Sequence, residues 1–295
     1  MWSCMMPTTT ICTRASLAEN PRAMRYRAPA RDAVETAVFA QPPLSFWQTY
    51  LHWLKEAAWP SVEQLNAAWP EAAPERFAAQ TRELLDDGLH YEQRIAERGL
   101  IATREANWHD LFNALIWLRY PAIKRALNAQ QVTEIAVMGA KQRSRPQCAL
   151  THFDEAGVIV IVRDPALLAD WDAHDWHGLF WRQRDAWHDG RIEATVFGHA
   201  LLEHALTPDK LLVGKALVFA AASGDTLQDV VTACATGVAT GRLLRDPLEL
   251  RPLPLSGIPG WHPDNANEVF HRTADCYQPK REGRHYPRPI CVNLS

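Results

Sequence analysis

Two short segments of the sequence place a histidine near an acid, and both contain the residue types needed for acid–base or metal chemistry. In WHDLFNALIWLRYP, His109 is followed directly by Asp110, and Asn113 lies one helical turn after His109. An imidazole in this position can bind a metal ion or act as a general base, with Asp110 orienting the ring. The alternative is a hydrogen-bonded histidine on a core helix, because buried polar groups usually satisfy one another.

The second segment, FGHALLEHAL, reads as a sharp turn at Gly198 followed by a helix that carries His199 and Glu203 one turn apart. Two ligands at this spacing are typical of zinc sites, and a carboxylate can also orient an imidazole that binds a metal. The spacing is neither H-E-x-x-H nor H-x-x-E-H, so it does not predict a metalloprotease. The alternative is a local hydrogen bond between His199 and Glu203 at the start of the helix.

Basic and amide side chains follow the first segment, in LRYPAIKRALN. Arg119, Lys124 and Asn128 could hold a phosphate or a carboxylate by charge-assisted hydrogen bonds, and the basic loop at 140–147 adds positive charge. With Asn113, these three side chains are the candidate substrate-binding residues, and a small anion is the candidate ligand. The alternative is a solvated basic face with no ligand.

The first half of the chain has the apolar periodicity of helices, from about 44 to 138. Helices are expected at about 74–87, 90–99 and 107–120, and the last of these carries His109. Its apolar residues form one arc, which leaves Trp117 on the face that should meet solvent.

In the second half, strands and helices alternate. CALTHF and VIVIV predict the two strands of a hairpin, and DEAG, with Asp154 and Glu155, predicts its turn. A tryptophan-rich helix is expected over 166–187. The strand EATVF, the helix HALLEHAL, the strand KALVFAA and the helix TLQDVVTACATGVAT then follow, so we predict an α/β (or α+β) protein with a mixed sheet and flanking helices.

The expected domain organisation is a single globular domain at 44–275. Residues 1–43 are predicted to form a poorly ordered extension, and prolines turn 246–262 into an extended strap. The basic stretch at 276–295 is predicted to be a mobile tail.

Composition excludes several classes of protein. With 47% hydrophobic and 22% charged residues over 295 positions, the chain is not disordered throughout. A net charge of -3 gives no overall positive field, which argues against nucleic acid as the partner.

Neither an apolar run of membrane-spanning length nor a signal peptide is recognisable. Walker, G-x-G-x-x-G, G-x-S-x-G and kinase motifs are missing, and six scattered cysteines suit a reducing cytosol.

Taken in order, WHDLFNALIWLRYPAIKRALN, CALTHFDEAG, FGHALLEH and PLPLSGIPGWHPDN resemble the bacterial family of proteins of unknown function numbered 3025. The resemblance covers about residues 45–275. It implies a bacterial, cytoplasmic protein without an established activity, so it transfers no catalytic residues. His262 stands where the family often has an aromatic residue after the GIPGW segment.

The leading hypothesis is an enzyme-like pocket between the helix of His109 and the turn at His199, with a hydrolytic or transferase-like reaction. The catalytic candidates are the two histidines and the acid near each of them: His109, Asp110, His199 and Glu203. Cofactor and metal are left open. The competing hypothesis is a non-catalytic interaction protein in which these side chains form a structural polar network. Exposed Trp117 and the tryptophan-rich helix at 171–187 would then form a partner surface.

Overall fold

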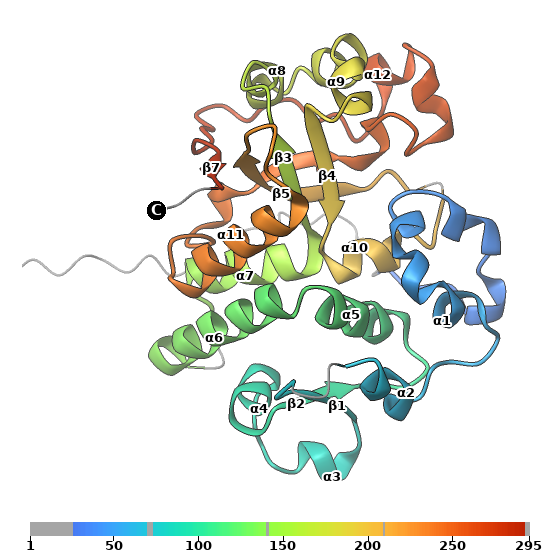
Figure 1. The fold of residues 1–295 in the computed structure, drawn as a ribbon, viewed down its shortest axis with the longest axis vertical. Helices are drawn as coiled ribbons and strands as arrows, with labels where there is room; N and C mark the ends of the chain where they lie inside the picture. The colour runs from blue at the N-terminus through green and yellow to red at the C-terminus, as the bar shows by residue number, and fades with distance from the viewer. Residues whose placement is uncertain (1–25, 70–72, 140–141, 209, 293–295) are drawn as a thin grey trace, which may run out of the picture.

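A mixed β-sheet occupies the upper half of the molecule in Figure 1, and helices separate it from a smaller lobe below. The computed structural model describes residues 26–69, 73–139, 142–208 and 210–292. Helices and a mixed sheet make it an α/β protein, as predicted. The four principal strands have the order β4-β3-β5-β6. Their bounds are β3 (Gly157–Val162), β4 (Ile192–Val196), β5 (Val213–Ala220) and β6 (Arg251–Pro254).

Strand β3 is the centre of this sheet and is buried along its whole length. It pairs antiparallel with β4 and parallel with β5, while β6 pairs antiparallel with β5. Its sequence, GVIVIV, has the β-branched residues that pack well on a pleated surface buried on both faces.

Five helices lie between the sheet and the lower lobe or flank the sheet. They are α5 (Trp108–Arg119), α6 (Pro121–Met138), α7 (Arg145–Ala156), α10 (His199–His204) and α11 (Leu227–Ala239). The Asn107 side chain caps α5 by accepting from the Asp110 backbone N–H, as its residue type predicts. Pro121 starts α6, where its missing N–H costs no hydrogen bond.

The predicted hairpin around Asp154 and Glu155 is wrong. These residues lie in the last turn of α7, and β3 begins directly after the helix. Ser144 and Gln147 form a reciprocal capping box, and Pro146 lies in the first turn. These N-terminal signals outweigh the β propensity of CALTHF.

The lower lobe is built around two parallel strands that the apolar pattern of the sequence does not predict. Its elements are α2 (Val62–Ala67), β1 (Arg76–Ala79), α3 (Arg82–Leu85), α4 (Tyr91–Arg98) and β2 (Leu100–Thr103). The helix expected at 74–87 is therefore a strand and one short helix, whereas the helix expected at 90–99 is α4. Gly99 ends α4 in the left-handed conformation, with φ of 65°.

The tryptophan-rich segment is not one continuous helix. It divides into α8 (Leu167–Ala173), a π-helical turn at 178–182 and α9 (Arg184–His188). His174 has a positive φ of 58°, which ends α8. Trp171 and Trp176 are buried, so this segment contributes to the core.

The two ends of the described chain pack more closely than expected. Val38 and Phe39 are buried within a short 3-10 helix at Thr36–Ala40, so this part of the predicted extension belongs to the folded body. The expectation for 1–25 lies outside the described residues. At the other end, β7 (Ile290–Cys291) pairs with β5 instead of belonging to a free tail.

The proline-rich strap forms β6, which lies at an edge of the sheet, where prolines do not interrupt the pairing of central strands. Helix α1 is Leu51–Lys55, and α12 is Phe270–Thr273.

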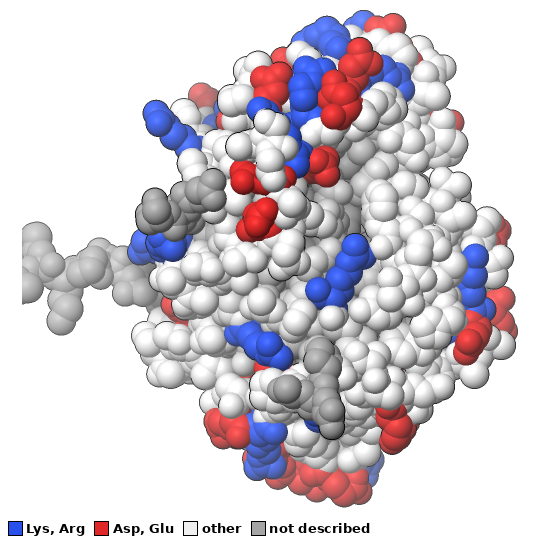
Figure 2. Space-filling view, in the orientation of Figure 1, with Lys and Arg blue, Asp and Glu red and all other residues white. Residues whose placement is uncertain are grey.

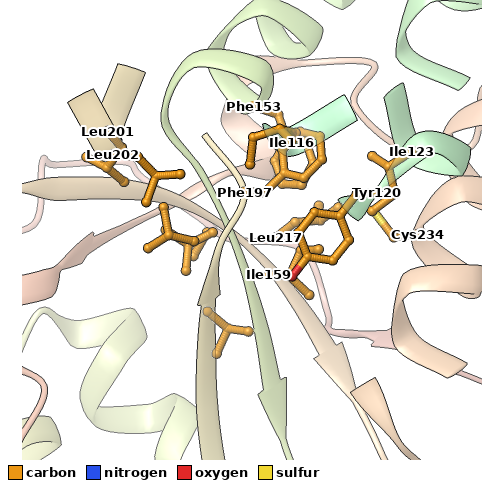
Figure 3. Close-up of a cluster of buried hydrophobic side chains, with 14 of the residues drawn as sticks. Ile116, Tyr120, Ile123, Phe153, Ile159, Phe197, Leu201, Leu202, Leu217 and Cys234 are labelled. Carbon is orange, nitrogen blue, oxygen red and sulfur yellow. The ribbon is translucent and has the colours of Figure 1, made fainter. Parts of the chain in front are cut away.

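One continuous hydrophobic core joins the helical half to the sheet. Figure 3 shows part of this core, where Phe153 of α7 lies beside Phe197, which follows β4. Their rings stack with centroids 5.0 Å apart. Tyr120 and Ile116, from the end of α5, contribute to the same cluster. Within the described part of the chain, no helix has both the length and the apolar character needed to span a bilayer.

Gly198 fixes how closely α10 approaches the junction of α7 and β3. Its backbone N–H donates to the Gly157 carbonyl at 2.8 Å, and a Cβ on Gly198 would lie 2.5 Å from Ala156 Cα. Only a residue without a side chain fits between these backbones. The next residue, His199, is thereby held beside the end of α7.

Replacement of Gly198 by alanine is expected to lower the free energy of unfolding by about 1–3 kcal/mol, because overpacking forces the backbones apart. Chemical denaturation followed by circular dichroism measures this change. Gly224→Ala is the matched control, since nothing lies within 4 Å of a Cβ at that position. Equal stability of the two variants would contradict the close-packing argument.

Candidate active site

A polar cavity of about 350 Å³ lies where α4, α5, α6, α7 and α10 converge. Helix α5 contributes residues one or two turns apart, and α6 and α7 contribute residues at the same helical spacing. The charged and polar residues that matter for its chemistry are Tyr91, Glu92, Arg104, His109, Asp110, Asn113, Lys124, Asn128, Asp154, Glu155 and His199.

The two predicted histidines meet in this cavity. Their Nε2 atoms are 3.0 Å apart, and the rings cross at 77°. His109 comes from the first turn of α5, and His199 is the first residue of α10, held there by Gly198. Residues 90 positions apart therefore form one centre, as the pocket hypothesis requires.

Glu203 contacts the histidine of the other segment. Its Oε2 accepts a hydrogen bond from Nδ1 of His109 at 3.0 Å, since an ionised carboxylate can only accept. The predicted local bond between His199 and Glu203 is therefore wrong. Because Glu203 holds the Nδ1 hydrogen of His109, the Nε2 atom of that ring faces His199.

Asp110 does not orient His109 as predicted. It accepts hydrogen bonds from the Arg104 backbone N–H at 2.6 Å and from the Arg104 guanidinium at 2.7 and 3.0 Å. This bidentate pair closes the turn before α5. Asp110 is thus adjacent to the histidine centre in sequence, but its carboxylate is committed to Arg104.

Lys124 is a buried cation with two polar contacts. Its ammonium donates to Asp154 Oδ1 at 2.6 Å and to Asn113 Oδ1 at 2.9 Å, and it lies 5.3 Å from the ring centre of Trp117. The Lys124 residue is only 4% exposed. The contacts with Asp154 and Asn113 therefore offset part of the cost of removing this charge from water.

Of the other predicted binding residues, Asn128 lines the cavity and Arg119 does not. Asn128 donates to the Glu92 carboxylate at 2.7 Å. Arg119 donates to the Phe46 carbonyl at 2.7 Å, and its guanidinium packs over the Trp47 ring, outside this cavity. Trp117, expected on a wet face, is 1% exposed and lines the cavity, which removes it from any partner surface.

Two carboxylates of the cavity are absent from the predicted site, because the sequence predicts a turn at their positions. Asp154 and Glu155 lie at the C-terminal end of α7, where each comes close to His199. Asp154 Oδ2 is 3.8 Å from Nδ1 of His199, and Glu155 Oε2 is 3.8 Å from its Nε2. Two signals in the sequence indicate the helix that carries them. One is the capping box at Ser144, and the other is that the residues lining the cavity recur every three or four positions between Gln147 and Asp154.

Burial and charge set the protonation of this cluster. Burial lowers the pKa of His199 to about 3, so this ring is neutral at pH 7. Burial also acts to lower the pKa of His109, but the hydrogen bond to Glu203 and the nearby carboxylates raise it overall. The pKa of Asp154 is lowered, because Lys124 and the two histidines outweigh the effect of burial. Burial raises the pKa of Glu155.

His109, Glu155 and His199 have the donor atoms of a metal site. One ligand atom from each lies within 4.8 Å of the others. Two imidazole nitrogens and a carboxylate oxygen are a common set of protein ligands for catalytic zinc, which keeps a fourth position for water or substrate.

The fold and this cluster define an α/β protein with a partly buried histidine–carboxylate centre at a helix junction. The chain belongs to the family described as protein of unknown function (DUF3025), whose sequence profile matches residues 75–281. That range includes every residue of the cluster. Comparison with curated proteins and with solved structures gave no significant match.

Replacement of Lys124 by methionine is expected to destabilise the protein by about 3–5 kcal/mol, because Asp154 would remain charged without its buried partner. The double variant Lys124→Met/Asp154→Asn should recover part of this loss, since it removes both charges. Urea denaturation of wild type, both single variants and the double variant gives the coupling energy. Additive losses would show that the two side chains do not stabilise each other.

Proposed function

We propose that this protein is a metal-dependent hydrolase whose centre is formed by His109, His199 and Glu155. The observation that carries the proposal is the 3.0 Å separation of the two histidine Nε2 atoms inside a polar cavity, with a carboxylate beside them. Hydrolysis is favoured over group transfer because the sequence has none of the common nucleotide-binding motifs of transferases. The family resemblance further implies a bacterial, cytoplasmic setting.

The donor distances suit a small ion such as zinc. Two nitrogens bound at about 2.0–2.1 Å in a tetrahedral site lie roughly 3.3 Å apart, close to the 3.0 Å between the Nε2 atoms. Glu155 Oε2 lies 3.8 Å from His199 Nε2, so a small side-chain movement would bring it to the same ion. Its side chain is 43% exposed, which leaves it free to make that movement.

Each imidazole also has a carboxylate near its other nitrogen. Glu203 accepts from Nδ1 of His109, and Asp154 lies 3.8 Å from Nδ1 of His199. Metal-binding histidines generally donate their second N–H to such an acceptor, which fixes the ring and strengthens the ligand. Nδ1 of His199 is buried and has no hydrogen-bond partner among the described residues, and a small movement would make the Asp154 carboxylate its acceptor.

A bound divalent ion would lower the pKa of a water molecule and polarise the bond to be cleaved. The chain itself supplies orientation and charge around that position. Glu203 holds the His109 ring, and Lys124 keeps Asp154 ionised beside His199. These roles suit the hydrolysis of an ester, an amide or a phosphate ester.

A second candidate function is metal-free acid–base catalysis by the two histidines. The observation in its favour is the raised pKa of His109, whose hydrogen bond to Glu203 favours the imidazolium form. That cation would donate from Nε2 to the neutral His199 ring, which also accounts for the 3.0 Å contact. Metal content separates the two candidates.

Metal analysis of untagged protein by elemental mass spectrometry is expected to give roughly one zinc or similar ion per chain. His109→Ala, His199→Ala and Glu155→Ala should each lose most of it. His152→Ala is the matched control, because His152 is exposed on the same helix as Glu155 and does not line the cavity. Retention of the metal by all three site variants would contradict the proposed ligand set.

Activity is expected toward at least one chromogenic substrate among p-nitrophenyl acetate, p-nitrophenyl phosphate, bis(p-nitrophenyl) phosphate and leucine p-nitroanilide. A chelator should abolish it and zinc should restore it, whereas His152→Ala should retain it. Activity that persists in the chelator and is lost in His109→Ala would support the metal-free alternative. Full activity of His199→Ala would contradict both candidates.

A further inference from the structure

A directed chain of hydrogen bonds runs from the buried lysine to a tyrosine in the cavity wall. Lys124 Nζ lies 2.9 Å from Asn113 Oδ1, and Asn113 Nδ2 lies 3.0 Å from the Tyr91 hydroxyl oxygen. The three residues come from α6, α5 and α4, so the chain joins the lower lobe to the helix that carries His109.

Donor and acceptor chemistry fixes the direction of this chain. An ammonium group can only donate, so the Asn113 atom that faces Lys124 must be its carbonyl oxygen. The amide nitrogen then faces Tyr91 and donates to the phenol oxygen. The one hydroxyl hydrogen of Tyr91 must therefore point elsewhere, and no acceptor for it is found among residues 26–69, 73–139, 142–208 and 210–292.

That hydrogen is available at the cavity. Tyr91 lines the cavity that also contains His109, Glu155 and His199. Asn113, which holds Tyr91, is one turn from His109 on α5, a rise of about 6 Å along the helix. Figure 1 shows the lobe that carries α4 below α5 and α6, and α4 packs against α6.

Tyr91 differs from Lys124 and Arg104, two of the charged donors that line the cavity. Lys124 is committed to Asp154 and Asn113, and the Arg104 guanidinium is committed to Asp110. On the face shown in Figure 2, basic and acidic side chains are interspersed, and most of the surface is uncharged. Tyr91 is a neutral donor whose oxygen the Asn113 amide has already oriented.

We propose that Tyr91 donates this hydrogen bond to the oxyanion that develops on the substrate, which makes the substrate a carbonyl or phosphoryl compound. This inference rests on the proposed hydrolase function and deepens it. Preorganised donors aimed at a developing oxyanion are among the largest contributions to catalysis. Asn113 and Lys124 are positioning residues, because they act on the substrate only through Tyr91.

The chemical step keeps the phenol intact. The oxygen of water forms a bond to the carbonyl carbon or to phosphorus, and the electron pair of the double bond moves onto the substrate oxygen. Tyr91 donates a hydrogen bond to that oxygen without transferring its proton, and burial raises the pKa of Tyr91, so the group stays protonated. The electron pair then re-forms the double bond, and the leaving group departs with its bonding pair and a proton that came from the water.

Inorganic phosphate is a suitable probe, because its oxygens resemble the developing oxyanion. Its affinity is measured by isothermal titration calorimetry on the full chain, with zinc and after chelation. Tyr91→Phe should weaken binding by about 10-fold or more, the effect of losing one hydrogen bond to a charged group. Metal content and melting temperature should remain close to wild type.

Two further variants separate donation by Tyr91 from a general structural effect. In Asn113→Asp the new carboxylate accepts from Lys124 and also attracts the hydroxyl hydrogen of Tyr91, so phosphate affinity should fall as in Tyr91→Phe. Tyr120→Phe is the control, since its hydroxyl is also buried and unpartnered among the described residues but does not line this cavity. It should bind phosphate as wild type does.

Equal phosphate affinity in Tyr91→Phe and wild type would overturn the proposal, as would a wild-type protein that binds no phosphate in either form. Absence of metal alone would contradict only the metal-dependent function, because a loss of phosphate affinity in the chelated Tyr91→Phe protein would still support donation by Tyr91. Metal binding with unchanged phosphate affinity would contradict only the inference about Tyr91.

Discussion

The arrangement of the site depends on one buried charge, the ammonium of Lys124. A lysine that is 4% exposed cannot keep its charge without close acceptors, and here the acceptors are Asp154 of α7 and Asn113 of α5. Satisfying this single cation therefore fixes the relative positions of three helices. The same contacts orient Asp154 toward His199 and Asn113 toward Tyr91. The need to pair one buried charge therefore determines how these side chains are arranged around the cavity.

The pairing of His109 with His199 is predictable from the sequence, but the partners of these side chains are not. His109 and His199 stood out because each is near an acid, and the structure brings the two rings into contact. The acids beside them in sequence have other roles: Asp110 pairs with Arg104, and Glu203 pairs with the histidine of the other segment. Local spacing indicates which side chains share a helix face, but it carries no information on how two helices cross.

The errors in the predicted secondary structure have the same origin, because only local signals can be recognised in the sequence. The central strand β3, the helices α5, α10 and α11 and the capping of α5 were predictable, because periodicity and capping residues are local signals. Strands β1 and β2 are four residues each and gain their stability by pairing across α3 and α4. Helix α7 was misassigned because its β-prone residues face a core that the sequence alone does not describe.

Helix α7 continues into β3 without a loop, and this continuity links the site to the most protected part of the molecule. Asp154 and Glu155 are followed within two residues by a strand buried along its whole length and paired on both sides. Backbone amides in such a strand exchange with solvent only when large parts of the fold open together. The backbone that carries the two carboxylates is therefore continuous with the central sheet, whereas Tyr91 reaches the cavity from α4 of the smaller lobe. The cavity thus combines one wall anchored in the central sheet with one wall contributed by a separate pair of strands and their helices.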